Sequence, residues 1–183
     1  MNKNIELEFK TVIPKPAYES ILTEYNLNDN VFLQTNHYFD TPDLALSNQH
    51  IVLRIRQKGK RFFKVTLKSQ HPEDAYESHI LLSKEQALTM LKDGFQTKDF
   101  FPKVDYFVTF QTSIDNYRAS MPYHHGIMFI DRCEYCGQVD YEIEYEVPQY
   151  EEGLKQFEMF LSKHQLNYEK TKRKSDRAFS CQI

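Results

Sequence analysis

The chain opens with Ile5-Glu6-Leu7-Glu8-Phe9-Lys10, a stretch in which apolar and charged residues alternate. Successive side chains of a β-strand point to opposite faces, so this alternation predicts a strand with one apolar face and one charged face. Glu6, Glu8 and Lys10 would share the charged face. The same pattern is also typical of the solvent-exposed side of an ordinary sheet, so a functional interpretation requires that other strands repeat it.

The composition is that of a folded globular protein. The chain has 183 residues, of which 40% are hydrophobic and 27% charged, and its 14 Phe and 12 Tyr suit β-strands. This length predicts one domain over residues 1–183. The net charge of -3 gives no general reason to bind nucleic acid or an anionic membrane. No apolar run approaches the roughly 20 residues that span a bilayer, and three cysteines make no complete disulfide framework, so we expect a cytoplasmic protein.

Two neighbouring stretches repeat the alternation with positive charges. Ile51–Gln57 and Phe62–Ser69 read as strands joined by the turn Lys58-Gly59-Lys60, which predicts a β-hairpin. Arg54 and Arg56 would lie on one face of its first strand, and Lys64 and Lys68 on one face of its second. The hairpin therefore carries a cationic stripe on each strand.

A later stretch, Val139–Val147, repeats the alternation with negative charges at Asp140, Glu142, Glu144 and Glu146. Carboxylates at every second position repel one another, and a bound divalent cation removes that repulsion. Carboxylate clusters suit Mg²⁺ or Mn²⁺, and Arg and Lys suit phosphate oxygens. The alternative is an ordinary sheet whose exposed charges form weak cross-strand pairs.

The remaining pattern predicts an α+β fold. We expect three helices, at Ala17–Tyr25, from the capping box Ser83-Lys84-Glu85-Gln86 to Lys92, and at Glu151–His164. Further strands are expected at Gln34–Thr41, Ala75–Leu82, Lys103–Gln111, Asn116–Met121 and Gly126–Cys133. Many strands with few helices indicate an antiparallel sheet that curls or closes, with its apolar face outward under the helices.

The ordered set of motifs resembles the CYTH domain, the triphosphate tunnel metalloenzyme family, over about residues 3–179. The motifs are Glu6-x-Glu8-x-Lys10, Tyr38-Phe39-Asp40-Thr41, Leu53-Arg54-Ile55-Arg56, Lys64-x-Thr66-x-Lys68, Glu142-x-Glu144 and Lys174-Ser175-Asp176-Arg177. The resemblance implies an eight-stranded antiparallel β-barrel with helices packed outside and a triphosphate and divalent metal inside.

Site residues follow from the resemblance motif by motif. The implied metal ligands are Glu6, Glu8, Glu142 and Glu144. The implied substrate-binding residues are Lys10, Arg54, Arg56, Lys64, Lys68, Arg118, Lys174 and Arg177. Glu6, Glu8, Lys10 and Glu144 would be catalytic. Glu77 and Asp131 are further acidic candidates, Asp140 and Glu146 extend the acidic face, and Tyr38 either lines the site or packs in the core.

The predicted activity is hydrolysis of a triphosphate to orthophosphate and pyrophosphate with Mg²⁺ or Mn²⁺. We find no signature of a nucleotide-base or thiamine pocket, so inorganic tripolyphosphate is the expected substrate, ahead of an organic triphosphate. The alternatives are a class IV-type adenylyl cyclase and a non-catalytic polyphosphate- or nucleotide-binding module. Cys133-x-x-Cys136 has no second cysteine pair of matching spacing, so we interpret it as a chance placement at a hairpin.

Overall fold

The computed structural model describes residues 7–69 and 76–182, the side chain of residue 182 excepted, and these residues form two compact units. Unit 1 contains residues 34–69, 76–114 and 174–182, and unit 2 contains residues 7–33 and 115–173. Each unit has its own hydrophobic core. The single domain predicted over residues 1–183 stays a prediction.

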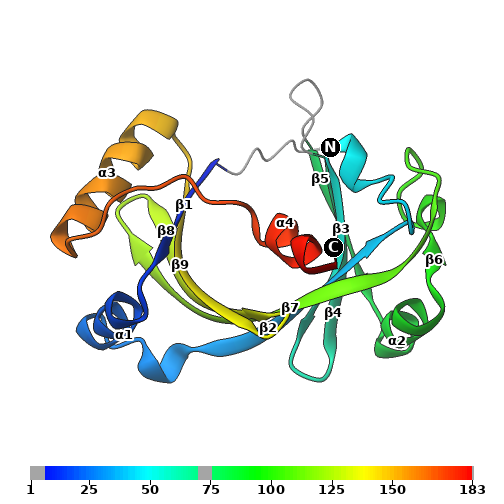
Figure 1. The fold of residues 1–183 in the computed structure, drawn as a ribbon, viewed down its shortest axis with the longest axis horizontal. Helices are drawn as coiled ribbons and strands as arrows, with labels where there is room; N and C mark the ends of the chain where they lie inside the picture. Colours follow the sequence, from blue (N-terminus) through cyan, green and yellow to red (C-terminus); the bar gives the residue numbers. More distant parts are fainter. Residues whose placement is uncertain (1–6, 70–75, 183) are drawn as a thin grey trace. The chain divides into compact units, whose positions relative to one another are not determined.

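Strands dominate the described residues (Figure 1). They are β1 (Leu7–Ile13), β2 (Phe32–Asp40), β3 (Ile51–Lys58), β4 (Phe62–Ser69), β5 (Tyr76–Leu82), β6 (Phe95–Gln96), β7 (Phe107–Tyr123), β8 (Gly126–Tyr135) and β9 (Gln138–Val147). The α-helices are α1 (Lys15–Glu24), α2 (Lys84–Asp93), α3 (Tyr150–Lys163) and α4 (Lys174–Phe179). None of these helices combines the length and apolar character needed to cross a membrane.

The predicted antiparallel sheet is confirmed. Paired strands follow the order β1-β9-β8-β7 in unit 2 and β7-β2-β3-β4-β5 in unit 1, with β7 contributing residues to both units. Each strand pair whose register is described is antiparallel. The eight strands in this order match the number that the family resemblance implies, and the two-residue β6 pairs with β7 outside it.

In unit 2 the helices cover the apolar face of the sheet, as the alternation predicted. Tyr18 and Ile21 of α1 and Phe157 and Phe160 of α3 share one buried cluster with apolar residues of β1, β7, β8 and β9. Figure 1 shows α1 and α3 on one side of these strands. The side chains at the alternating positions of the same strands, which include Lys10, Arg118, Asp131, Glu142 and Glu144, therefore lie on the opposite face.

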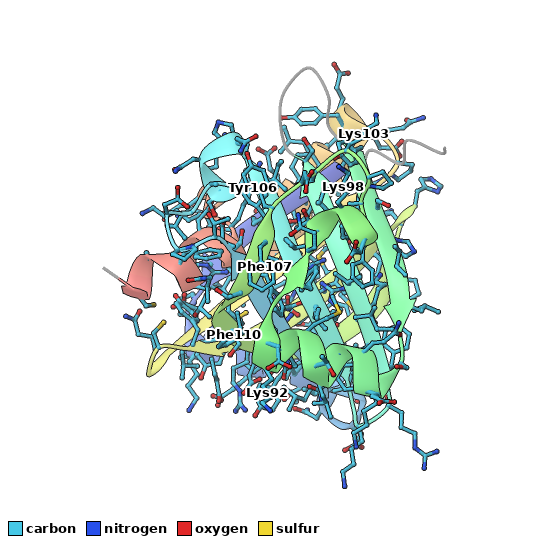
Figure 2. All side chains as sticks on the ribbon, turned by 90° about the vertical axis from the view of Figure 1, so that its right-hand side faces the viewer. Lys92, Lys98, Lys103, Tyr106, Phe107 and Phe110 are labelled. Carbon is cyan, nitrogen blue, oxygen red and sulfur yellow. The ribbon has the colours of Figure 1, made fainter. Side chains whose placement is uncertain are left out.

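Unit 1 repeats the arrangement with a different helix. Leu53 and Val65 of the basic hairpin pack in one cluster with Ala87 and Met90 of α2. The predicted capping box is present, because the Ser83 hydroxyl accepts from Gln86 N and the Gln86 side chain accepts from Ser83 N. Figure 2 views the protein from the side of α2, with the labelled residues Phe107 and Phe110 of β7 nearby.

The acidic residue of the motif Tyr38-Phe39-Asp40-Thr41 has a structural role. Asp40 is buried at the end of β2, and its carboxylate accepts hydrogen bonds from the backbone N–H groups of Thr41, Leu46 and Ser47 and from the Ser47 hydroxyl. These bonds fold the connector that leads to β3. Asp40 therefore positions the basic hairpin rather than presenting its charge to a ligand.

Two expectations from the sequence differ from the structure. Lys103–Gln111 and Asn116–Met121 were expected as separate strands, but β7 is one strand that begins at Phe107 and ends at Tyr123. Residues 112–115 contain neither Gly nor Pro to break it, although they lack apolar alternation. The basic tail contains the short helix α4, which was not expected.

Candidate functional site

Two tight hairpins set the register of β7, β8 and β9, the strands that carry Arg118, Asp131, Glu142 and Glu144 on what we call the acidic face of unit 2. β7 and β8 are joined through His124 and His125, and β8 and β9 through Cys136 and Gly137. Cys136 and Gly137 both have positive φ, at 49° and 72°, as a type I′ hairpin turn requires. The placement of Cys136 at a hairpin is thereby confirmed.

These turns place charged side chains in rows across neighbouring strands. Arg118 of β7 lies opposite Asp131 of β8, which lies opposite Glu142 of β9. In the adjacent row, Glu144 of β9 lies opposite Lys10 of β1. Directly opposed residues of an antiparallel pair point to the same face, so these five side chains share the face away from α1 and α3.

Arg118 is the central cation of this acidic face. Its guanidinium donates to both oxygens of Asp131, with Nε 2.8 Å from Oδ1 and Nη2 2.6 Å from Oδ2. Nη2 also donates to Oε2 of Glu144, and the guanidinium carbon lies 4.1 Å from the centre of the Phe129 ring. Burial lowers the pKa of Arg118, but the attraction of Asp131 and Glu144 outweighs it and raises that pKa well above its ordinary value.

Lys10 holds the other oxygen of Glu144. Its Nζ lies 3.6 Å from Oε1 and also forms an ion pair with Glu8. Glu144 is therefore contacted by Lys10 at one oxygen and by Arg118 at the other. This arrangement fixes the orientation of a buried carboxylate that the sequence pattern had singled out.

Three potential metal-ligand atoms lie beside this group. One ligand atom each from Asp131, Cys133 and Glu142 lies within 4.8 Å of the others, and all three residues are 0% exposed. Cys133 Sγ is 3.6 Å from Oδ1 of the buried Asn116. Lys10 and Arg118 supply two positive charges to a face that carries Glu8, Asp131, Glu142 and Glu144. This excess of carboxylate oxygen fits a hard divalent cation.

The outer acidic positions of β9 differ from the inner two. Asp140 accepts a hydrogen bond from the Tyr135 hydroxyl beside the β8–β9 turn. Glu146 lies opposite Glu8 of β1 in the strand register. Both extend the acidic face, as expected, whereas Glu142 and Glu144 lie in the rows of Asp131 and Lys10.

Unit 1 holds the predicted basic face. Arg56 lies between Asn36 of β2 and Lys64 of β4, and Arg54 lies between Tyr38 and Thr66. Arg56 Nε donates to Asn36 Oδ1 at 3.0 Å. These side chains point away from the core shared by Leu53, Val65 and α2, so the hairpin presents its cations on one face.

The edge of this basic face also carries one acidic residue. Lys68 of β4 lies opposite Glu77 of β5, with Nζ 3.7 Å from Oε2. Glu77 was an acidic candidate, and the structure places it beside a predicted phosphate-binding lysine.

Helix α4 adds Lys174 and Arg177, both buried, to unit 1. Tyr38, also buried, packs against Phe179 of the same helix, with ring centroids 5.9 Å apart. Tyr38 therefore packs against Phe179 and also lies opposite Arg54 on the face of the hairpin that carries the cations.

The predicted site residues thus fall into two groups, each within one unit. Unit 2 brings together Glu8, Lys10, Arg118, Glu142 and Glu144, and unit 1 brings together Arg54, Arg56, Lys64, Lys68, Lys174 and Arg177. Glu6 lies outside the described residues. Sequence reasoning missed Cys133 and Asn116 as neighbours of the acidic group, and Asn36 as a member of the basic face.

Comparison with known proteins identifies relatives over nearly the full length. A sequence model described as the CYTH domain matches residues 4–179. The chain is 32% identical over 187 residues to the Bacillus subtilis (strain 168) protein named "Putative triphosphatase YjbK", covering 95% of this chain and 94% of that protein.

Solved structures agree on the fold. A "putative adenylate cyclase" from Bacillus halodurans is 30% identical with a TM-score of 0.86, covering 98% of this chain and 100% of that one. HpAC1 from Hippeastrum, described as a "putative adenylyl cyclase" with a dominant triphosphatase activity, is 22% identical with a TM-score of 0.76, covering 96% and 95%. The family match over residues 4–179 and the 32% identical Bacillus subtilis relative establish that the chain belongs to the CYTH domain family.

Proposed function

We propose that this protein is a divalent-metal-dependent triphosphatase that hydrolyses inorganic tripolyphosphate to orthophosphate and pyrophosphate. The observation that carries the proposal is the cluster of buried carboxylates in unit 2, formed by Asp131, Glu142 and Glu144. Within it, Arg118 and Lys10 contact different oxygens of Glu144. Membership of the CYTH family and the name of the Bacillus subtilis relative support the same activity.

The acidic face is suited to hold Mg²⁺ or Mn²⁺ through Glu8, Glu142 and Glu144, together with Glu6 outside the described residues. Asp131 and Glu142 are fully buried and supply oxygen ligands of the kind these ions prefer. When bound, such a cation neutralises charge on the phosphate oxygens and so makes the phosphorus easier to attack.

The chain's own residues supply binding and orientation. Arg54, Arg56, Lys64 and Lys68 offer guanidinium and ammonium donors to the phosphate chain, and Lys174 and Arg177 add two more. Lys10 and Arg118 hold Glu144 in one orientation. In the proposed reaction, water attacks the terminal phosphorus, the bond from that phosphorus to the bridging oxygen breaks, and pyrophosphate leaves with that oxygen. A carboxylate of the acidic face accepts a proton from the water.

Adenylyl cyclase is the second candidate, and the 30% identical Bacillus halodurans protein described as an adenylate cyclase favours it. In that reaction the ribose 3′-hydroxyl of ATP replaces water as the nucleophile, so the products are cyclic AMP and pyrophosphate. A binding module without turnover is the third. A cytoplasmic location stays a prediction of the sequence.

The test is a comparison of substrates with purified protein. Orthophosphate release is measured from tripolyphosphate, ATP and pyrophosphate, each with Mg²⁺, Mn²⁺ or chelator, and cyclic AMP is measured in the ATP reactions. We expect metal-dependent release that is fastest with tripolyphosphate. Formation of cyclic AMP would favour the cyclase, and binding of tripolyphosphate without release of any product would favour the binding module.

A further inference from the structure

The basic face of unit 1 contains buried neutral donors as well as cations. Gln34 Nε2, Asn36 Nδ2 and Thr66 Oγ1 are inaccessible to solvent and have no hydrogen-bond partner among residues 7–69 and 76–182. Asn36 and Thr66 are each only 1% exposed. Buried polar atoms of native proteins are nearly always hydrogen-bonded, so each of these atoms needs an explanation.

The orientation of the Asn36 amide follows from its neighbour. Arg56 Nε can only donate, and its hydrogen bond of 3.0 Å therefore requires the carbonyl oxygen of Asn36. The amide nitrogen must then occupy the other position, with both of its N–H groups available. If the amide oxygen and nitrogen of Asn36 were exchanged, the Asn36 N–H groups would face the Arg56 N–H donor, which is unfavourable. The contact with Arg56 therefore fixes the position of the two N–H groups.

Thr66 lies at the centre of the cationic residues of the hairpin. It is opposite Arg54 in the strand register, and it lies two residues from Lys64 and two from Lys68 on the same face of β4. Valine has nearly the same shape as threonine and would fill this buried position without an unpartnered hydroxyl. The hydroxyl is therefore a donor that packing alone does not require.

The missing partner should be rich in acceptors and negatively charged. Asn36 Nδ2 can only donate, Thr66 Oγ1 can donate, and the surrounding Arg54, Arg56 and Lys64 side chains add donors without acceptors. Non-bridging phosphate oxygens supply acceptors in several directions. Neutral donors can approach such oxygens without adding to the mutual repulsion of the cations.

We propose that Asn36 Nδ2 and Thr66 Oγ1 donate hydrogen bonds to non-bridging oxygens of a polyphosphate bound on the basic face, and that both residues are substrate-binding residues of this protein. The inference rests on the proposed function, since it takes a polyphosphate as the ligand of that face. It adds two uncharged ligands that the family motifs had not singled out for this role.

The test compares the same substitution at two buried threonines of unit 1. In Thr66→Val the lost hydroxyl has no partner among the described residues. In the control Thr97→Val the lost hydroxyl donates to Val104 O at 2.7 Å and accepts from Tyr106 N at 2.9 Å. Thermal unfolding is recorded for both variants. Tripolyphosphate affinity is measured by calorimetry in EDTA, and KM is measured with Mg²⁺.

We expect opposite results from the two variants. Thr66→Val should bind tripolyphosphate about tenfold more weakly, the loss expected for one hydrogen bond to a charged ligand, with an unchanged or higher Tm. Thr97→Val should have a lower Tm and unchanged affinity. Asn36→Asp, which keeps the acceptor for Arg56 but replaces the donating nitrogen with a charged oxygen, should bind more weakly than Thr66→Val.

The outcomes separate this inference from the proposed function. Wild-type affinity and KM in Thr66→Val, with the wild-type protein binding tripolyphosphate, would overturn the inference and leave the triphosphatase proposal standing. A wild-type protein that neither binds nor hydrolyses tripolyphosphate would overturn both. Equal loss of affinity in Thr66→Val and Thr97→Val would also overturn the inference, because it would indicate a general effect on unit 1.

Discussion

Arg118 holds Asp131 at both carboxylate oxygens, and both side chains are buried in the acidic face of unit 2. A buried ion pair of this kind contributes little compared with an apolar replacement of both partners, but losing one partner is costly. The remaining charge then has neither water nor a counterion. This asymmetry yields the first prediction.

Arg118→Met should reduce the free energy of unfolding by about 3–5 kcal/mol, since Asp131 and Glu144 would both lose their guanidinium partner. Urea denaturation measures the loss. The matched control is Arg132→Met on the other face of β8, where the partly exposed pair with Glu134 predicts a loss of about 1 kcal/mol or less. Equal losses in the two variants would contradict the account.

Glu144→Gln should leave the protein folded but lower triphosphatase kcat/KM by about 100-fold or more, since a neutral amide replaces a carboxylate proposed to bind the metal. Glu142→Gln should behave in the same way. Glu134→Gln, a carboxylate of β8 that pairs with Arg132, is the control and should keep wild-type activity. Metal-dependent turnover that survives in both Glu144→Gln and Glu142→Gln would refute the assignment.

Gly153→Ala should destabilise unit 2, although the intrinsic helix propensity of alanine is more favourable than that of glycine by up to about 1 kcal/mol. A Cβ at Gly153 in α3 would lie 2.5 Å from Cγ2 and 3.0 Å from both Cβ and Cγ1 of Val147. Rotation of Val147 cannot relieve all three contacts, so we expect a net loss of about 1–3 kcal/mol. The double variant Gly153→Ala with Val147→Ala should recover part of it, and a more stable single variant would disprove the packing argument.

His164 should make unit 2 less stable as the pH falls from about 7.5 to 5.5. Burial lowers the pKa of His164 below its ordinary value of 6.5, against the opposing effect of Glu24, and Lys163 lowers it further. The unfolded chain therefore binds the proton more readily, so this stabilising contribution is present above pH 6.5 and is lost as the pH falls through the lowered pKa.

Thermal unfolding at several pH values measures this effect, and His164→Gln should flatten the dependence in that range. Glu24 also has a lowered pKa, caused first by its hydrogen bond with Lys163, but its titration lies below pH 4.5 and does not overlap. A pH dependence that is identical in the variant and the wild type would rule out His164 as its source.

The faces of the strands could be predicted from the sequence because side-chain alternation is a local geometric property. The row of Arg118, Asp131 and Glu142 was predictable in principle as well. Arg118 lies five residues before Tyr123 and Asp131 five residues after Gly126, so a two-residue turn between Tyr123 and Gly126 pairs them. The turns His124-His125 and Cys136-Gly137 set the registers that form this row.

Other features depended on contacts between distant segments. Helix α4 has six residues, which is too few for a periodic signal, and its Lys174 and Arg177 look like a solvated charge run in the sequence although both are buried. Asn116 belongs to no motif, and the Cys133-x-x-Cys136 spacing did not point to the acidic group. Cys133 joins that group two residues after Asp131 on β8, and the β7–β8 register places Asn116 opposite Cys133. Thr66 lies in the Lys64-x-Thr66-x-Lys68 motif, but the sequence does not show that its hydroxyl is buried without a partner among the described residues.

The most direct test of the central claim is phosphorus NMR of tripolyphosphate incubated with wild-type protein, in parallel with Glu144→Gln and Glu134→Gln. The account predicts equal amounts of orthophosphate and pyrophosphate from the wild type and from Glu134→Gln with Mg²⁺ or Mn²⁺. It predicts no product in EDTA and product formation that is slower by about 100-fold or more from Glu144→Gln. Intact tripolyphosphate with either metal, or undiminished hydrolysis in EDTA, would contradict it.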